Sequence, residues 1–412
     1  MYKHPLLQKL NLLQKIILIS SILIAICFWS NLTLDINPFG TKWAYPFFIL
    51  YLSIILTDKK KYWKSYKWEF STIVIWTIFT VFLSFIPAYI DWGQSIFTSI
   101  AASIKWTWVL LLYFVLRKWN ISTNVIMKYI IIISTIWVII EIGQQFTFPT
   151  YWFAGSPNKD YGIAQRMGLY RFYIWGVDFV MLAYAYCLGK FASHKKTISK
   201  KLLVLSIVFL IGLLSYCSRK HIYISLAAIG YAGLMLKNKY RFYVWTLFII
   251  IFIFLFYNFY NEFTEMNQTA VESQGEGEDF IRFLSLKYFL FDFSDSPLYF
   301  LLGSGIPGDS KLWEITNFLK ENFGFYREDI GIFGYYSLFG IIGTSAILFY
   351  LWTFLKNWKY IDLWLKIFFL MKVLLIVFDF WAMWNVGNMA YAIFLYMLDL
   401  NIQKNKRQRT EI

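Results

Sequence analysis

Apolar residues recur along this chain in long runs, separated by short polar or charged segments. The runs span roughly 14–24 residues, and most are long enough to cross a hydrocarbon core of about 30 Å as a helix. The pattern predicts an all-α polytopic membrane protein, with residues 1–412 forming one integral membrane domain. The twelve predicted spans are Ile16–Leu34, Trp43–Leu56, Phe70–Ile90, Ser95–Leu116, Asn124–Gln144, Phe172–Gly189, Leu202–Cys217, Ile222–Leu236, Phe242–Tyr260, Ile332–Leu355, Ile361–Phe378 and Val386–Leu400.

The composition argues against a large soluble core and against nucleic acid as a partner. Hydrophobic residues make up 59% of the chain and charged residues only 15%, too few to cover a soluble domain of this size. The net charge of +15 lies mostly in short clusters between apolar runs, as in a membrane protein whose orientation is set by its loops. The three cysteines lack CxxC spacing, so they predict neither a disulfide framework nor a metal site.

Clusters of Lys and Arg set the predicted orientation. With twelve spans, every cluster falls on one side of the membrane, which the positive-inside rule assigns to the cytoplasm together with both termini. The clusters comprise Lys3, Lys9 and Lys15; Lys59–Lys61, Lys64 and Lys67; Arg117 and Lys118; Lys190, Lys195, Lys196, Lys200 and Lys201; Lys237, Lys239 and Arg241; Lys356 and Lys359; and Lys404, Lys406, Arg407 and Arg409.

The same alternation places two long segments on the extracytoplasmic face. These are residues 145–171 and the large loop between the ninth and tenth spans, residues 261–331, and we expect them to cover an active site. Within the large loop, Glu278–Asp292 and Ser310–Asn322 are predicted to form helices lying along the membrane interface. Asp309 or Ser310 is a candidate N-cap of the second helix.

Five arginines lie on the predicted outer face, where the rule expects few positive charges: Arg166, Arg171, Arg219, Arg282 and Arg327. Arg219 lies in a tight turn between two short spans, at the edge of the membrane. A guanidinium binds phosphate bidentately and stays charged, so these residues are candidate ligands of a phosphate-bearing substrate. The alternative is that each one simply reaches lipid phosphates at the headgroup level.

Three segments, in order, resemble the superfamily of O-antigen polymerases and O-antigen ligases. The turn SYCSRKHIYISLAAIG resembles the Ser-Arg start of a superfamily helix, with Arg219 and Gly230 in an Arg-x10-Gly pattern. In EDFIRFLSLKYFLFDFSDSPLYFLLGSG, an arginine heads a helix that leads to Ser-Pro and a Gly-x-Gly turn, and REDIGIFGYYSLFGIIG is similar to the segment that begins the next span. The matching residues in these two are Arg282, Pro297, Gly303, Gly305, Asp329, Gly331, Gly340 and Gly343.

The resemblance implies a GT-C-like, metal-independent glycosyltransferase of a bacterial plasma membrane, with no cofactor. It would transfer a growing glycan from undecaprenyl pyrophosphate to a lipid-linked repeat unit on the extracytoplasmic face, among membrane lipids and with a chain-length regulator protein as a further candidate partner. Ligases typically carry a His-Asn pair where this chain has Glu328-Asp329, which favours a polymerase. A ligase-like transferase with another acceptor remains the alternative.

Such a transfer needs stabilisation of the pyrophosphate charge and an acceptor for the proton of the attacking hydroxyl. Arg219 is the candidate for the first role, and Asp329 and Glu328 for the second, with neighbouring Arg327 expected to lower the pKa of Asp329. Alternatively, Asp329 caps the tenth span, or both carboxylates pair with Arg327 or Arg282. The predicted substrate-binding set is Arg166, Arg171, Arg219, His221, Arg282 and Arg327, where His221 serves either the acceptor site or only a basic turn.

Three ionisable residues lie inside predicted spans: Lys105, Glu141 and Asp178. Because unpaired charge in hydrocarbon is costly, Lys105 is expected to pair with Asp178 or Glu141, or the three to line a hydrophilic cavity. A transporter or lipid-linked oligosaccharide flippase is the rival class, but the sequence shows no internal repeat of the kind such proteins carry.

Overall fold

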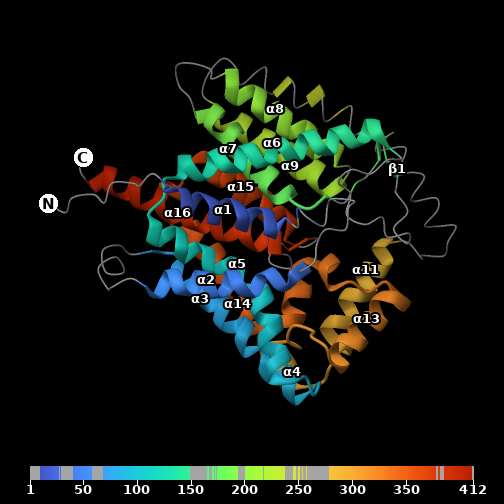
Figure 1. Ribbon diagram of the computed structural model, residues 1–412. Helices are drawn as coiled ribbons and strands as arrows, with labels where there is room; N and C mark the ends of the chain where they lie inside the picture. Colours follow the sequence, from blue (N-terminus) through green and yellow to red (C-terminus); the bar gives the residue numbers. More distant parts are fainter. Residues whose placement is uncertain are drawn as a thin grey trace.

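The computed structural model describes residues 10–26, 28, 40–57, 68–148, 165–166, 169–170, 172, 174–193, 200–216, 218–236, 245–246, 249–250, 253, 257, 278–376, 379–380 and 385–410. Nearly all of them are helical (Figure 1). Within this part of the chain, the strands are β1 (Gln165–Arg166) and β2 (Leu169–Tyr170), which pair antiparallel.

Helices lie in most of the predicted spans. They are α1 (Leu12–Ala25), α2 (Ala44–Leu56), α3 (Ser71–Leu83), α4 (Phe85–Ile90), α5 (Ile96–Trp119), α6 (Thr123–Thr147), α7 (Val177–Ser193), α8 (Lys200–Ser215), α9 (Arg219–Met235), α14 (Gly331–Lys356), α15 (Leu363–Leu375) and α16 (Asn385–Thr410). However, α1 begins four residues earlier than predicted and ends at Ala25 rather than Leu34, and α16 continues ten residues past the predicted Leu400. The predicted third span is divided into α3 and α4 at Ser84. The predicted ninth span, Phe242–Tyr260, lies largely outside the described residues.

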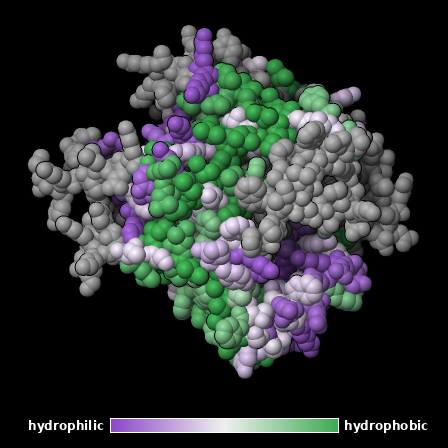
Figure 2. All heavy atoms as spheres, viewed as in Figure 1, coloured by the Kyte–Doolittle hydropathy of each residue, from purple (hydrophilic) through white to green (hydrophobic). Residues whose placement is uncertain are grey.

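Among the described residues, four helical segments are long and apolar enough to cross a membrane: Ser71–Ile90, Ile96–Trp119, Thr123–Thr147 and Ile332–Lys356. Two shorter apolar helices, Leu12–Ala25 and Ala44–Leu56, lie among them. In Figure 2, hydrophobic residues cover the middle of the visible face, and hydrophilic residues gather over α11 and α13. The chain is therefore a helical membrane protein.

The centre of the bundle is α7, which packs against α6, α8, α9 and α15. Its apolar residues are buried all round, as expected of a helix enclosed by others. A Cβ on Gly189 would lie 2.3 Å from the Trp364 Cα atom of α15, so the missing side chain is what allows this close approach.

The basic clusters at the ends of several helices come together at one end of the bundle. Lys190 of α7 lies 3.6 Å from the Asp362 carboxylate, and Arg409 of α16 donates to the carbonyl of Lys359 over 3.2 Å. Lys406 pairs with Glu69 over 3.0 Å. The start of α1 and the end of α16 lie on this side, and α11 and α13 lie on the opposite side (Figure 1).

A buried carboxylate fastens α16 to α3 and α5 near the same end. Asp399 is fully buried and accepts hydrogen bonds from the backbone N–H of Glu69 (2.8 Å) and Phe70 (3.3 Å) and from the Tyr113 hydroxyl (2.5 Å). It thus satisfies backbone donors at the start of α3 that would otherwise be buried without a partner.

The predicted loop helices are present, and they pack around a small core of their own. The first is α11 (Glu278–Lys287), continued by the π-helical turn η2 (Tyr288–Asp292), and the second is α13 (Lys311–Phe323) with Ser310 before its first residue. Between them lies α12 (Pro297–Leu302), and after them the 3-10 turn η3 (Arg327–Ile330). The small core comprises Phe289, Phe293, Tyr299, Leu312, Leu319 and Ile330.

The Gly303–Gly305 turn after α12 fills a break in α14. Gly340 interrupts α14 with φ 60° and ψ −164°, and Gly303 has φ 74° and ψ −166°, a region that essentially only glycine adopts. The carbonyls of Ser337 and Leu338 accept hydrogen bonds from Ser304 N–H (2.9 Å) and Gly305 N–H (3.0 Å). This contact fixes the large loop to the helix that begins directly after η3.

Candidate active site

The turn η3 directs its three charged side chains to different places. Arg327 is only 2% exposed, donates from Nη1 to the Ser304 hydroxyl over 2.9 Å, and has its guanidinium carbon 4.7 Å from the ring centres of both Phe289 and Phe293. Burial is the main influence on its pKa, which is lowered. Within the described chain, its Nε and Nη2 atoms have no hydrogen-bond partner. Arg327 therefore anchors η3 in the loop core.

Glu328 pairs with a lysine that the sequence did not single out. Its Oε1 atom lies 3.0 Å from the Lys320 ammonium on α13, eight residues earlier in the chain. From the sequence, only Arg327 and Arg282 are named as candidate partners of Glu328. The sequence does not reveal the lysine partner, because Lys320 and Glu328 lie on either side of the turn at Gly324 that ends α13.

Asp329 lies near charged side chains from three other segments, namely Arg282, Lys220 and Asp379. Its side chain is exposed, yet packing around the turn raises the pKa of its carboxyl above the usual range. The positive charges of Arg282 and Lys220 oppose this rise, and the negative charges of Glu328 and Asp379 add to it. The expectation that Arg327 would lower the pKa of Asp329 is wrong, because Arg327 turns away into the loop core.

Asp329 is not a helix cap. The residue that precedes α14 is Ile330, and no side chain accepts a hydrogen bond from the first turn of that helix. The backbone N–H of Asp329 donates to the Tyr326 carbonyl over 3.2 Å, as part of η3 itself. The capping alternative is thus removed, and the carboxylate of Asp329 is free of a structural task at this helix.

The end of α15 joins η3 to the start of α9. The backbone N–H of Ile332 donates to the Ile376 carbonyl over 2.8 Å, and the rings of Tyr335 and Phe380 lie 4.9 Å apart. Between these contacts lies Asp379, whose Oδ2 atom is 2.5 Å from the Lys220 ammonium in the first turn of α9. The charged cluster, defined here as Lys220, Arg282, Asp329 and Asp379, therefore gathers four segments far apart in the sequence.

The other predicted site residues lie around this cluster or outside the described residues. Arg219 is the first residue of α9, next to Lys220, and Arg166 lies in β1, but neither side chain is described. Arg171 falls outside the described residues. His221 is 3% exposed, its Nδ1 atom lies 2.9 Å from the Ser218 hydroxyl, and its ring meets the Tyr216 ring edge-on at 5.3 Å.

The intramembrane charges pair differently from the expectation. Asp178 forms an ion pair with Lys372 of α15, which is only 4% exposed, rather than with Lys105. Both carboxylate oxygens of Glu141 are buried without a hydrogen-bond partner among the described residues, so the Lys105–Glu141 pair is also absent there. Lys372 was missed because its helix reads as an apolar span, and only the packing of α15 on α7 reveals its partner.

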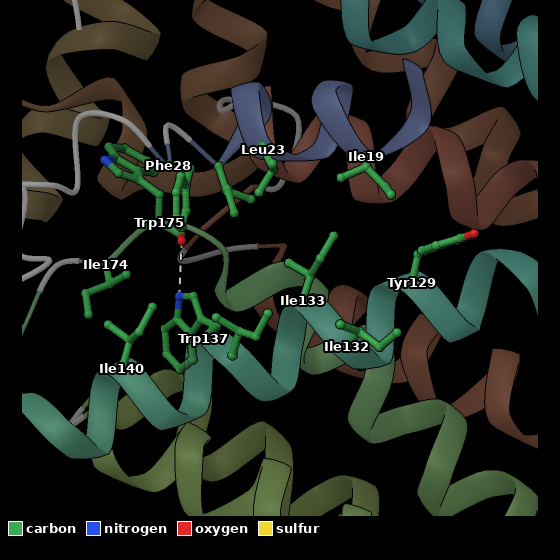
Figure 3. Close-up of a pocket in the computed structure, with 12 residues that line it drawn as sticks. Ile19, Leu23, Phe28, Tyr129, Ile132, Ile133, Trp137, Ile140, Ile174 and Trp175 are labelled. Atoms are coloured by element: carbon green, nitrogen blue, oxygen red, sulfur yellow. Dashed lines mark hydrogen bonds between the residues drawn. The ribbon is translucent and has the colours of Figure 1, made fainter. Parts of the chain in front are cut away.

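A separate apolar cavity of about 320 Å³ lies between α1 and α6 (Figure 3). Its wall includes Leu23 of α1 and Ile133 and Trp137 of α6, and the Trp137 indole donates to the Trp175 carbonyl over 3.0 Å at one end. None of the described residues that line it is charged. The cavity cannot host ionic chemistry, but it suits a hydrocarbon chain.

Within the described residues, no group of three or more His, Cys, Asp or Glu side chains has a metal-binding arrangement. No family model and no curated protein matches this chain.

Proposed function

We propose that the protein is an O-antigen-type polysaccharide polymerase of a bacterial plasma membrane. It transfers a growing glycan from undecaprenyl pyrophosphate to the terminal sugar of a lipid-linked repeat unit. The observation that carries the proposal is the charged cluster, in which the carboxylate of Asp329 lies among cations from α9 and α11. Asp329, Arg282 and the first turn of α9 are also the places where the sequence resembles the superfamily.

The orientation follows from the separation of charges between the two ends of the bundle. The end where Lys190, Arg409 and Lys406 gather is assigned to the cytoplasm with both termini, across twelve spans. This assignment puts the loop helices α11 and α13, at the opposite end of the bundle, on the extracytoplasmic face. The cover of the site by residues 145–171 and 261–331 remains a prediction from the sequence.

The reaction needs an attacking hydroxyl, a leaving group and a destination for one proton. The acceptor hydroxyl oxygen forms a bond to the anomeric carbon of the donor glycan, and the bond from that carbon to the pyrophosphate oxygen breaks. The departing pyrophosphate keeps the electron pair and its charge is stabilised by Arg219 and Arg282. Asp329 takes the hydroxyl proton, and its raised pKa makes it a stronger base than an ordinary aspartate.

The apolar cavity between α1 and α6 supports a lipid-linked substrate. Its lining segment Ile174–Trp175 leads within a few residues to Asp178, whose partner Lys372 lies in the last turn of α15. We propose that this cavity holds part of the hydrocarbon chain of the lipid-linked substrate.

A flippase or transporter fits less well. Broken helices in such proteins line the substrate path with unpaired backbone groups. The break in α14 at Gly340 is instead filled by protein, because Ser304 and Gly305 occupy the carbonyls of Ser337 and Leu338.

The test is elongation of a lipid-linked repeat unit by the purified protein in proteoliposomes, read as a ladder of glycan lengths. Asp329→Asn keeps the shape of the side chain but removes the base, so we expect at least a hundredfold loss of elongation. Arg282→Lys keeps the charge but loses the bidentate fork, and we expect a loss of similar size. Asp295→Asn, an exposed carboxylate of the same loop, is the matched control.

Normal ladders from both Asp329→Asn and Arg282→Lys would refute the proposed site. Addition of one glycan to a non-repeat acceptor, without a ladder, would point to a ligase that uses the same chemistry. Movement of the lipid-linked unit across the bilayer with no new glycosidic bond would refute transferase activity altogether.

A further inference from the structure

The ion pair between Lys220 and Asp379 joins the first turn of α9 to the chain after α15. Lys220 lies in the first turn of α9, directly after Arg219, and that turn contains no acidic residue. A cation at a helix N-terminus is repelled by the positive end of the helix dipole, so two cations there are electrostatically unfavourable without an anion. In this structure the anion is the carboxylate of Asp379, 2.5 Å from the Lys220 ammonium.

The pair is accessible and lies beside η3. The side chains of Lys220 and Asp379 are 31% and 22% exposed, so a solute can reach both. The hydrogen bond from Ile332 to Ile376 and the contact of Tyr335 with Phe380 hold the chain on either side of Asp379 against the start of α14, next to Asp329. The start of α9, with its N–H groups and the Lys220 ammonium, therefore meets the proposed base across Asp379.

We propose that Lys220 is a further anion-contacting residue of the site, and that Asp379 competes with the anion for it. The ligand class is a phosphate or pyrophosphate group. When it binds, its oxygens replace the Asp379 carboxylate at the Lys220 ammonium, and no covalent bond changes. The naming of a pyrophosphate lipid rests on the proposed function, but the anion site itself is tested without any glycan.

The reasoning predicts opposite effects for the two partners. In the free protein, Asp379 neutralises Lys220. The anion must displace the Asp379 carboxylate, and the free energy lost with that ion pair reduces the net binding free energy of the anion. Removing Lys220 deletes a contact to the anion, and removing the Asp379 charge frees that contact. Two residues of one ion pair would merely destabilise the fold if the pair were structural, and both substitutions would then act in the same direction on any ligand.

The experiment titrates inorganic pyrophosphate into the full-length protein in detergent by calorimetry, in one low-salt buffer. We expect Lys220→Met to weaken binding about tenfold and Asp379→Asn to tighten it about threefold to tenfold. The matched controls are Lys287→Met on α11 and Asp309→Asn before α13. Both residues are exposed, and each substitution removes the same charge as its counterpart elsewhere in the loop. Both controls should bind like the parent. Lys220→Gln replaces Lys220→Met if the latter does not elute as a single species.

A double-mutant cycle separates competition from general electrostatics. If Asp379 acts through Lys220, the tightening caused by Asp379→Asn should largely disappear in the Lys220→Met background. Tightening of undiminished size in that background would overturn the competition, and parent-like binding by Lys220→Met would overturn the contact. Pyrophosphate binding with the expected pattern in a protein that makes no glycan ladder would refute the proposed function and leave this inference standing.

Discussion

The two glycines at the break in α14 offer a sharp test of how the large loop is fixed to the membrane domain. A Cβ on Gly303 would lie 2.2 Å from the Leu338 carbonyl carbon, and a Cβ on Gly340 would lie 2.3 Å from the Leu301 carbonyl carbon. Both collisions are with backbone, which cannot rotate away as a side chain can. Substitution by alanine must therefore separate the Gly303–Gly305 turn from α14.

The size of the effect follows from two contributions. An alanine at φ 74° or 60°, with ψ near −165°, costs roughly 1–3 kcal/mol in backbone strain. Separating the turn from α14 also weakens the hydrogen bonds that Ser304 and Gly305 donate, each worth about 1 kcal/mol. The sum is about 3–5 kcal/mol for Gly303→Ala or Gly340→Ala, large enough to detach the loop while the membrane helices stay folded.

The assay is thermal unfolding of the detergent-purified protein, followed by tryptophan fluorescence and by loss of the monodisperse peak. We expect both variants to unfold about 5–10 °C below the parent and to lose elongation, because η3 follows the loop core that the turn supports. Gly143→Ala is the control, because nothing lies within 4 Å of its Cβ position inside α6, and it should be neutral or slightly stabilising. Parent-like melting of Gly303→Ala and Gly340→Ala would refute the reasoning.

Three further predictions concern charges and the cavity. The folded-state pKa of Asp329 is raised above its ordinary value of 3.8, so the contribution of this carboxyl to stability is present below that value and is lost as pH rises through the raised pKa. The melting temperature of Asp329→Asn should therefore exceed that of the parent at neutral pH and converge with it at acidic pH. Asp399→Ala leaves three donors buried without an acceptor and should cost about 3–5 kcal/mol, measured as a lowered melting temperature, with Asp309→Ala unchanged. Ile133→Trp fills the apolar cavity and should weaken binding of a lipid-linked substrate by about tenfold while leaving inorganic pyrophosphate binding unchanged, measured by calorimetry.

The candidate site shows where sequence reasoning succeeds and where it stops. Arg282 and Asp329 were found from their position outside the spans and from the resemblance, and both contribute charge to one cluster. Lys220 and Asp379 were not, because they lie 159 residues apart and pair only through the packing of α15 on α9. A signal for Lys220 was present in the first turn of α9, which has two cations and no acidic residue.

The amino-acid sequence by itself determined the helices, because each apolar run must satisfy its own backbone hydrogen bonds and its length decides whether it can cross a membrane. Hence α5, α6 and α14 begin and end within a few residues of the predicted spans, and the loop helices α11 and α13 were also foreseen. Only the tertiary structure decided which charges meet. Lys372 pairs with Asp178, 194 residues away in the sequence, and Arg327 points into the loop core instead of toward Asp329. Such choices depend on the contacts between helices, which no local pattern along the chain records.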